Sequence, residues 1–208
     1  MVRVRSIAAA LLLSSGSAAA DVDWAKGQIT AEGLGVADRH APSPAAAREP
    51  ARRRAEEAAK QQLAAQLPAL PLASGGTLKA KLVDKQIAAR IARAVDAAIT
   101  VAATPHTDGS WNVTLAVPIE AVRLALVGPR TVAKPDGDPP IVIVEGSKAK
   151  PAIGYAIGGI AAAALWVKDV PAWAKDAPRV KATAASGAAI ELASKRGGAS
   201  TLYLVLAK

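Results

Sequence analysis

The sequence contains no cysteine, and this absence excludes several kinds of chemistry. Disulfide bonds, thiolate nucleophiles and thiolate metal ligands all require that residue. A lipid anchor attached to a cysteine after an export signal is excluded for the same reason. We therefore expect a fold without disulfides and a chain that is not lipid-anchored.

Histidine and phenylalanine are scarce as well. The chain has two histidines, His40 and His106, and neither has a second candidate ligand at the spacing of a metal site. The nucleophile-elbow and phosphate-loop motifs are missing. We predict no catalytic residue, no cofactor and no metal, and an exported hydrolase is the least favoured alternative. With no phenylalanine, the core must consist of valine, isoleucine, leucine and much alanine.

The first twenty residues have the order of a secretory signal peptide. A basic start with Arg3 and Arg5 precedes an apolar run at residues 7–13, and small residues lead to Ala20. The apolar run is shorter than the ~20 residues that a transmembrane helix requires. We expect export to the periplasm or the periphery of the outer membrane, with a mature chain that begins at Asp21.

The expected mature chain is basic. The formal net charge is +9 for the whole sequence and +7 without the two arginines of the signal peptide. Nucleic acid is not the usual partner of an exported protein, so the charge favours anionic lipid headgroups, envelope polymers or acidic protein faces. We expect an envelope protein or an anionic envelope polymer as partner, with no nucleic acid and no transmembrane span. Peripheral membrane contact agrees with this expectation.

A strand and a long helix are predicted first. Residues 27–37 alternate between apolar and polar around Gly33 and Gly35, and these two glycines indicate a strand with a bend or bulge. Ser43 is a good helix-capping residue, and Pro44 suits the first helical position. Since Pro50 follows six residues later, the helix should either begin near Glu49 or have a kinked first turn.

The stretch from Arg48 to Leu67 combines basic residues with alanine and leucine. A nucleic-acid arm, a membrane stripe and a packed helix are all compatible with such a composition. The spacing favours the packed helix, because small and aliphatic residues share one arc while charged and polar residues lie opposite. The arc comprises Ala51, Ala55, Ala58, Ala59, Leu63 and Leu67, and the opposite side carries Arg53, Arg54, Glu57 and Gln61.

A second helix is predicted, with Thr77 as its cap. One narrow face should be buried, with Ile87 at its centre. The remaining surface is strongly basic and is either the anion-facing surface of the protein or an ordinary solvated face. The expected buried stripe is Ala80, Val83, Ile87, Ile91 and Ala94, and the basic residues are Lys79, Lys81, Lys85, Arg90 and Arg93.

A hairpin and a third helix complete the predicted N-terminal domain. The strands are expected at residues 99–103 and 111–117 around an Asp108-Gly109 turn, and the helix at residues 119–127. Residues 128–140 are rich in proline and glycine and indicate a linker.

The remaining chain is predicted to be β-rich, with strands at residues 141–146, 179–184, 188–192 and 200–207. An uncharged run at residues 152–167 is either a set of strands in a sandwich or a membrane-associated segment. Its shortness and its glycine and alanine content favour strands. The predicted domains are a signal peptide (1–20), an α+β domain (21–127), a linker (128–140) and a β-rich domain (141–208).

The order of strand, alanine-rich helix, second helix, hairpin and third helix resembles the small α+β domain of the Lpp-twenty outer-membrane lipoproteins. The N-terminal domain of the flagellar assembly protein T, a periplasmic component, is similar to it. The matching positions are Ala51, Ala55, Ala59 and Leu63 in the first helix and Val113, Leu115 and Val117 in the hairpin. The resemblance covers about residues 27–127. Two departures are Pro50 at the helix start and the absence of the lipid-bearing cysteine.

The resemblance implies a component of the envelope or of the motility apparatus rather than an enzyme. Together with the export signal, it predicts a non-enzymatic α+β protein with a structural or assembly role in the cell envelope. The alternative is a charge-driven binder of anionic envelope polymers or of the membrane surface, which would act through the basic second helix.

Overall fold

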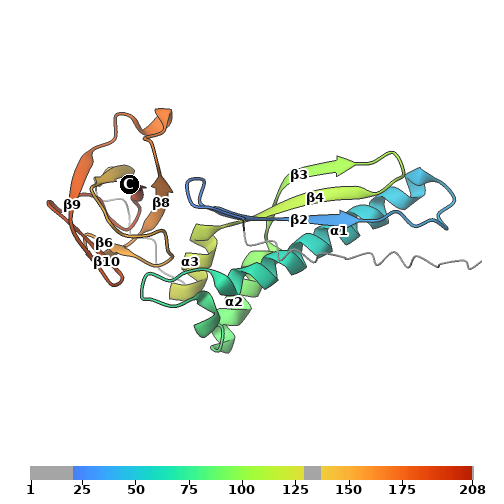
Figure 1. Ribbon diagram of the computed structural model, residues 1–208, viewed down its shortest axis with the longest axis horizontal. Helices are drawn as coiled ribbons and strands as arrows, with labels where there is room; N and C mark the ends of the chain where they lie inside the picture. Colours follow the sequence, from blue (N-terminus) through green and yellow to red (C-terminus); the bar gives the residue numbers. More distant parts are fainter. Residues whose placement is uncertain (1–20, 129–136, 208) are drawn as a thin grey trace, which may run out of the picture.

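The computed structural model describes residues 21–128 and 137–207 and contains two sheets, one in each half of the chain (Figure 1). The fold class is α+β, as predicted. The expected signal peptide and residues 129–136 of the predicted linker lie outside the described residues, as does residue 208.

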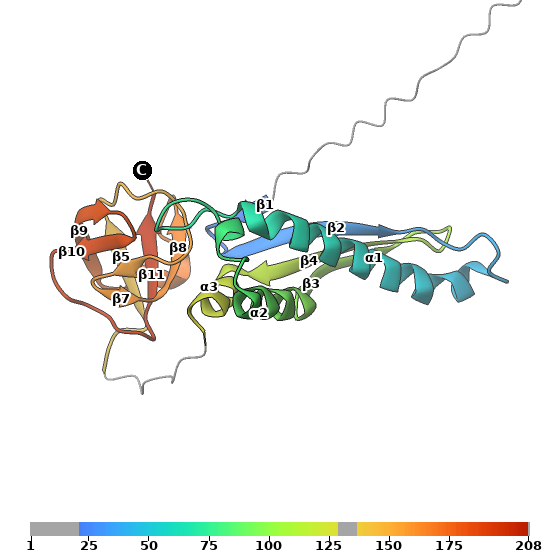
Figure 2. The ribbon, with the colours of Figure 1, turned by 90° about the horizontal axis from the view of Figure 1, so that it is seen from below.

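The N-terminal half is an antiparallel four-stranded sheet in the order β1-β2-β4-β3, with its helices on one side (Figures 1 and 2). The predicted hairpin and third helix are confirmed. The elements are β1 (Asp21–Asp23), β2 (Gln28–Gly35), α1 (Pro44–Gln66), α2 (Lys85–Asp96), β3 (Ile99–Pro105), β4 (Trp111–Pro118) and α3 (Ile119–Val127). Two short 3₁₀ turns, η1 (Leu67–Ala69) and η2 (Leu78–Ala80), lie between α1 and α2.

The helix α1 lies very close to β2 because both present small residues to each other. A Cβ atom added at Gly33 would overlap the carbonyl oxygen of Ala55, and one added at Gly35 would overlap that of Ala51. The strand pairs with β4 without any register shift, so these glycines form no bulge, and the bulge that the sequence allowed is wrong. The α1 residues with no exposed surface are Ala51, Ala55, Ala59 and Leu63.

The start of α1 was predicted correctly at its cap. The Ser43 hydroxyl accepts a hydrogen bond from the Ala46 amide at 3.2 Å. The helix begins at Pro44 and continues through Pro50, so the expectation of a start near Glu49 is wrong. A proline inside the helix removes one hydrogen bond. Pro50 lies near the N-terminal end of α1, so this loss is away from the main core.

The start of α2 differs from the prediction. Thr77 precedes only η2, and its side chain makes no capping hydrogen bond. The cap of α2 is Asp84, whose carboxylate accepts hydrogen bonds from the amides of Gln86 at 2.7 Å and Ile87 at 3.3 Å. The helix is therefore shorter than expected, and its buried stripe is shifted toward its C-terminal end.

The buried stripe of α2 consists of Ile91 and Val95. Ala80 and Val83 lie before the helix and are exposed, Val83 by 84 %. Ile87 is only partly buried and packs against the core of the N-terminal half, so its predicted place at the centre of the stripe is wrong.

We expect Ile91→Ala to lower the free energy of unfolding by about 2–4 kcal/mol, because it removes buried methyl groups and leaves a cavity. Val83→Ala should change it by less than about 0.5 kcal/mol, since that side chain is in water. Ile87→Ala should fall between the two. Denaturant melts of the three variants measure this order, and a larger loss at Val83 than at Ile91 would show that α2 is misplaced.

The C-terminal half is one curled seven-stranded sheet, in the order β7-β6-β10-β9-β5-β11-β8, rather than the expected sandwich. Strands form at all the predicted positions, including the run at residues 152–167. They are β5 (Ile141–Glu145), β6 (Ala156–Ile157), β7 (Ile160–Ala161), β8 (Ala163–Val167), β9 (Arg179–Ser186), β10 (Ala189–Leu192) and β11 (Leu202–Leu206), and a 3₁₀ turn η3 (Ala172–Ala174) follows β8. No helix among the described residues is long and apolar enough to cross a membrane.

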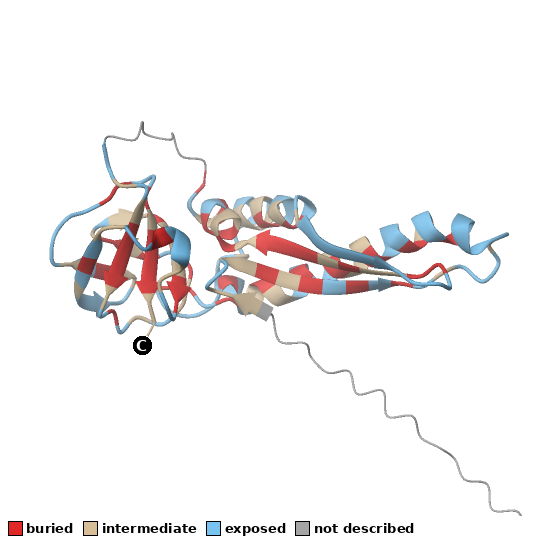
Figure 3. Ribbon diagram, turned by 90° about the horizontal axis from the view of Figure 1, so that it is seen from above, coloured by how far each residue is buried: buried red, intermediate tan, exposed pale blue. Residues whose placement is uncertain are grey.

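The centre of this sheet is buried on both faces (Figure 3). Strand β11 pairs in parallel with β5 and β8, and parallel strands covered on both sides consist of nearly continuous apolar residues. Val142 and Val144 of β5 face one core cluster, whereas Ile143 faces another that includes Ala174 of η3. The apolar runs of β5 and β11 thus reflect burial on two sides.

Backbone hydrogen bonds join the two halves at two places. The carbonyl of Trp24, in the β1–β2 turn, accepts a hydrogen bond from the amide of Trp166 in β8 at 3.0 Å. The amide of Ile153 donates to Pro71 at 3.0 Å, and its carbonyl accepts from Ala73 at 2.9 Å. Trp24 also packs against the cores of both halves, so the two halves share contacts. The predicted division into two domains with a linker stays a prediction.

A buried arginine on α3 makes a third connection. Arg123 is 8 % exposed and donates two hydrogen bonds to the carboxylate of Glu120, at 2.7 and 2.6 Å. Its third nitrogen donates to the carbonyl of Ala161 in β7 at 3.4 Å. The Glu120 carboxylate compensates the charge of the buried Arg123 guanidinium, whose burial without a partner would be unfavourable.

Both tyrosines of the chain are buried in the C-terminal half. The Tyr203 hydroxyl donates to the carbonyl of Arg196 at 3.0 Å, and that of Tyr155 donates to the carbonyl of Lys150 at 3.1 Å. Burial raises the pKa of both phenols above the ordinary value of 10.0, and the Asp138 carboxylate adds to the effect at Tyr203. The folded protein therefore disfavours the phenolate form.

We expect alkaline titration of the folded protein to show tyrosinate only above the ordinary tyrosine pKa. In denaturant both residues should ionise near about pH 10. Because the folded-state pKa is raised, its contribution to stability is complete below the unfolded value and is lost as the pH rises through the folded value. Absorbance titration measures both curves, and coincident curves would contradict the burial of the tyrosines.

Candidate interaction surfaces

The predicted anion-facing surface is only partly assembled. Arg90 is half-buried, and its Nε donates to the carbonyl of Ala125 near the end of α3 at 2.6 Å, so it ties α2 to α3. The other four residues of the set are exposed and form no ion pair with any described residue. These four residues are Lys79, Lys81, Lys85 and Arg93, and we call them the basic patch. Lys79 and Lys81 precede α2, so the patch does not form one helical face.

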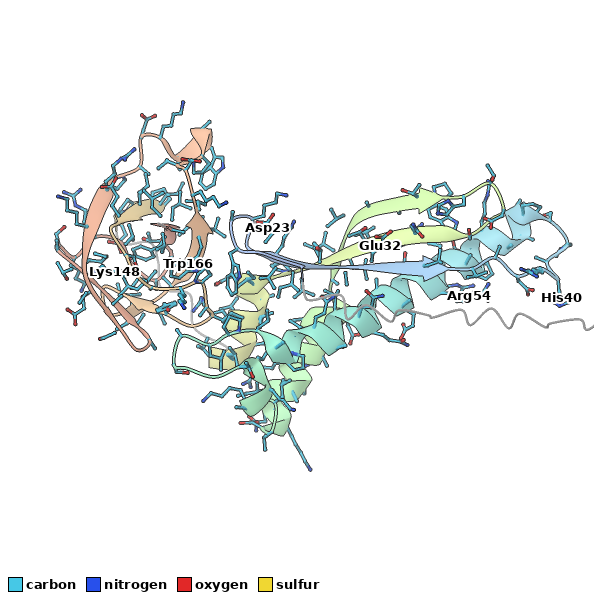
Figure 4. All side chains as sticks on the ribbon, viewed as in Figure 1. Asp23, Glu32, His40, Arg54, Lys148 and Trp166 are labelled. Carbon is cyan, nitrogen blue, oxygen red and sulfur yellow. The ribbon has the colours of Figure 1, made fainter. Side chains whose placement is uncertain are left out.

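Neither histidine belongs to a group of potential metal ligands in the described part of the chain. His40 is exposed in the loop before α1 (Figure 4), and His106 is exposed at the hairpin turn. No group of three or more potential metal-ligating side chains occurs in residues 21–128 and 137–207. Asp108 accepts hydrogen bonds from the hydroxyl and amide of Ser110, and the hydroxyl bond holds the pKa of its carboxyl below the ordinary value. It forms the turn, as predicted.

The strand β3 is an exposed edge of the four-stranded sheet. All seven of its residues, Ile99 to Pro105, are exposed, because α1 packs on β2 and β4. Ile99 and Val101 expose 58 % and 55 % of their surface, and the strand contains no charged residue. We call this strand the β3 edge.

An edge strand presents unpaired backbone groups to solvent, and natural proteins usually protect such edges with charged side chains, bulges or proline. The β3 edge has a register shift between Thr100 and Ala102 and a proline at its end, but no charge. It is therefore only partly protected against pairing with another strand.

The face of the sheet opposite the helices continues this surface. Glu32 of β2 points away from α1 (Figure 4), and no described helix covers that side. Leu34 and Val36 at the far end expose 57 % and 62 % of their surface. The sheet thus has one face packed by helices and one that no described helix covers and that is partly exposed, which is common in antiparallel sheets.

A second surface is an open groove of about 890 Å³ between the β1–β2 turn and the segment from β8 to η3. Three of the four tryptophans of the chain line it: Trp24, Trp166 and Trp173. Trp166 is 4 % exposed and belongs to the core, whereas Trp173 is 59 % exposed. We call this surface the tryptophan groove.

Charged residues of both signs line the tryptophan groove. The Asp23 carboxylate accepts hydrogen bonds from the amides of Ala25 at 3.1 Å and Lys26 at 2.9 Å, and it pairs with the Lys26 ammonium at 3.2 Å. The backbone hydrogen bond from Lys26 holds the pKa of Asp23 below its ordinary value. Lys168 and Asp169 stand on the opposite wall.

The two halves of the chain meet at the tryptophan groove, so sequence spacing did not reveal it. Trp24 and Trp173 are far apart in sequence, and the only available signal was the low aromatic content of the chain, 3 %. The strand β3 was predicted, but its place at the sheet edge depends on the strand order.

The described geometry is that of an α+β protein with an accessible sheet edge and an inter-half groove. A scan against protein-family models finds no match for the chain, and a search of the curated proteins finds none.

Proposed function

We propose that the protein is an exported, non-enzymatic structural or assembly component of the cell envelope, which contacts another envelope protein through the β3 edge. The observation that carries this proposal is an uncharged seven-residue edge strand without a single buried side chain. A partner strand that pairs with this edge would satisfy its backbone groups and remove Ile99 and Val101 from water.

The N-terminal sequence supports the location of this role. Residues 1–20 have the order of a signal peptide. The resemblance of residues 27–127 to the Lpp-twenty outer-membrane lipoproteins and to flagellar assembly protein T supports an envelope or motility-apparatus setting. The periplasm and the periphery of the outer membrane are the compartments in which we place the contact.

Binding of the mature protein to isolated envelope fractions tests the proposal. Val101→Lys should weaken binding at least about tenfold, because the lysine places a charge on the β3 edge. Val83→Lys is the matched control, since Val83 is also an exposed valine but lies before α2. It should bind like the wild type. Equal binding by both variants and the wild type would overturn the β3 contact.

A charge-driven contact is the second candidate, and the exposure of the basic patch favours it. Binding through Lys79, Lys81, Lys85 and Arg93 would weaken steeply with ionic strength, whereas pairing at the β3 edge would not. Replacing Lys85 and Arg93 together by glutamine should leave envelope binding unchanged if β3 is the contact. A loss in this variant, with Val101→Lys unaffected, would support the charge-driven binder instead. Arg90 is unsuitable for this test because it holds α3.

A further inference from the structure

We propose that the tryptophan groove is a carbohydrate-binding site for a short, uncharged stretch of a glycan chain. The groove is separate from the β3 edge, so this inference does not depend on the proposed assembly contact. It follows from three properties of the groove: an exposed tryptophan on an anchored turn, balanced charge, and walls that are already in place.

The exposure of Trp173 is unusual for this chain. The protein has no phenylalanine, and both tyrosines are buried, so aromatic side chains serve mainly in cores. Trp173 nevertheless has 59 % of its surface in water. A large exposed aromatic side chain in a groove is typical of a binding site, because its rigid ring offers much contact area for little loss of entropy.

The backbone around Trp173 is well fixed. The amide of Ala174 donates to the carbonyl of Pro171 at 3.0 Å, and that of Ala177 donates to the carbonyl of Ala174 at 3.1 Å. The Ala174 side chain is 2 % exposed and packs into the core under β5 and β11. The η3 turn therefore presents the indole ring outward from an anchored base.

Charge in the groove is balanced, although the chain as a whole is strongly basic. The lining contains two ammonium groups, of Lys26 and Lys168, and two carboxylates, of Asp23 and Asp169. A polyanion would meet as many like charges as opposite ones, so the groove favours a polar but uncharged ligand. Carboxylates accept hydrogen bonds from hydroxyl groups, and ammonium groups donate to them.

A sugar chain has the matching chemistry. In a β-linked glucose-type pyranose chair the hydroxyl groups are equatorial, so the faces of the ring present axial C–H groups, which can lie against the apolar face of an indole ring. The ring edge carries hydroxyl groups that can bond to the charged side chains and to the amide of Gln28, which also lines the groove. The volume of about 890 Å³ lies within the usual range of small-ligand sites, about 300–1,000 Å³.

The two walls are already held together. The backbone hydrogen bond between Trp24 and Trp166 links the β1–β2 turn to β8, and both residues line the groove. Gly27 lies against the side chain of Leu165, and a Cβ atom there would contact it. A ligand would therefore bind a preformed groove, with little cost for rearrangement.

Titration of the mature protein with chitotetraose and with cellotetraose tests the site, with tryptophan fluorescence and calorimetry as readouts. We expect binding of at least one of these neutral sugars, with an affinity that changes less than about twofold between low and high salt. The acetamido groups of chitotetraose distinguish an amino-sugar chain from a plain glucan.

Trp173→Ala should lower the affinity at least about tenfold while the circular dichroism spectrum stays that of the wild type. Asp169→Asn should also weaken binding, whereas Trp111→Phe should not, because Trp111 pairs with Gly35 at the opposite end of β2 from Gln28 and lies outside the groove. The inference is overturned if neither sugar binds at millimolar concentration, if Trp173→Ala binds as tightly as the wild type, or if only a polyanion such as heparin or only a peptide binds.

Discussion

Replacing Ala55 with aspartate should unfold the N-terminal half or destabilise it by several kcal/mol. Ala55 has no exposed surface, and its backbone lies directly against Gly33 of β2. A carboxylate at this position would be buried between helix and sheet without a partner, and a buried unpaired charge costs several kcal/mol. Thermal and denaturant melts followed by circular dichroism measure the loss.

Two controls separate burial from charge. Ala65→Asp introduces the same side chain on the same helix at an exposed position and should change stability by less than about 1 kcal/mol. The double variant Arg53→Gln/Arg54→Gln should behave like the wild type in melts and in envelope binding, because both arginines are exposed. A stable Ala55→Asp protein together with a defective arginine variant would mean that the basic residues, rather than the alanines, are the essential feature of α1.

The second large effect is expected at Gly35. Its substitution by alanine should lower stability by about 1–3 kcal/mol or more, because the added Cβ would overlap the backbone of Ala51 and would force the strand and the helix apart. Gly33→Ala should behave similarly, since its Cβ would overlap the backbone of Ala55. Denaturant melts at equal protein concentration give the comparison.

The control for the glycine variants is Glu32→Ala, on the same strand but on the accessible face. It should change stability by less than about 0.5 kcal/mol. If Gly35→Ala and Glu32→Ala melt alike, α1 does not lie as close to β2 as described. The small side chains of Ala51, Ala55 and Ala59 would then not be required by close helix–strand packing.

Local signals predicted much of the N-terminal half. The Ser43 cap, the Asp108 turn and the third helix depend on neighbouring residues, and the structure confirms them. The start of α2 could not be found in this way, because Thr77 and Asp84 are both good caps. Leu78 explains why the helix begins at the second of these caps. Its side chain is fully buried, and its amide donates to the carbonyl of Leu70 at 2.8 Å, so the segment around Leu78 is not part of α2.

Features that depend on the arrangement of distant segments were missed. The alternation around Gly33 and Gly35 predicted a strand, but the reason for the glycines lies in α1, which they contact. The predicted anion-facing surface was partly wrong for the same reason. Arg90 was grouped with exposed lysines by its position in sequence, and the structure places its guanidinium on the end of α3.

Site-specific cross-linking tests the central claim, the contact through the β3 edge. A photoreactive amino acid is placed at Val101 in one variant and at Val83 in the other, and cells that produce each full-length protein are irradiated. We predict a single product of the Val101 variant that contains this chain and one other envelope protein, and no such product of the Val83 variant. Products from both variants, or none from Val101, would contradict the claim. A product of two copies of this chain would contradict a heterologous partner and show self-association at β3.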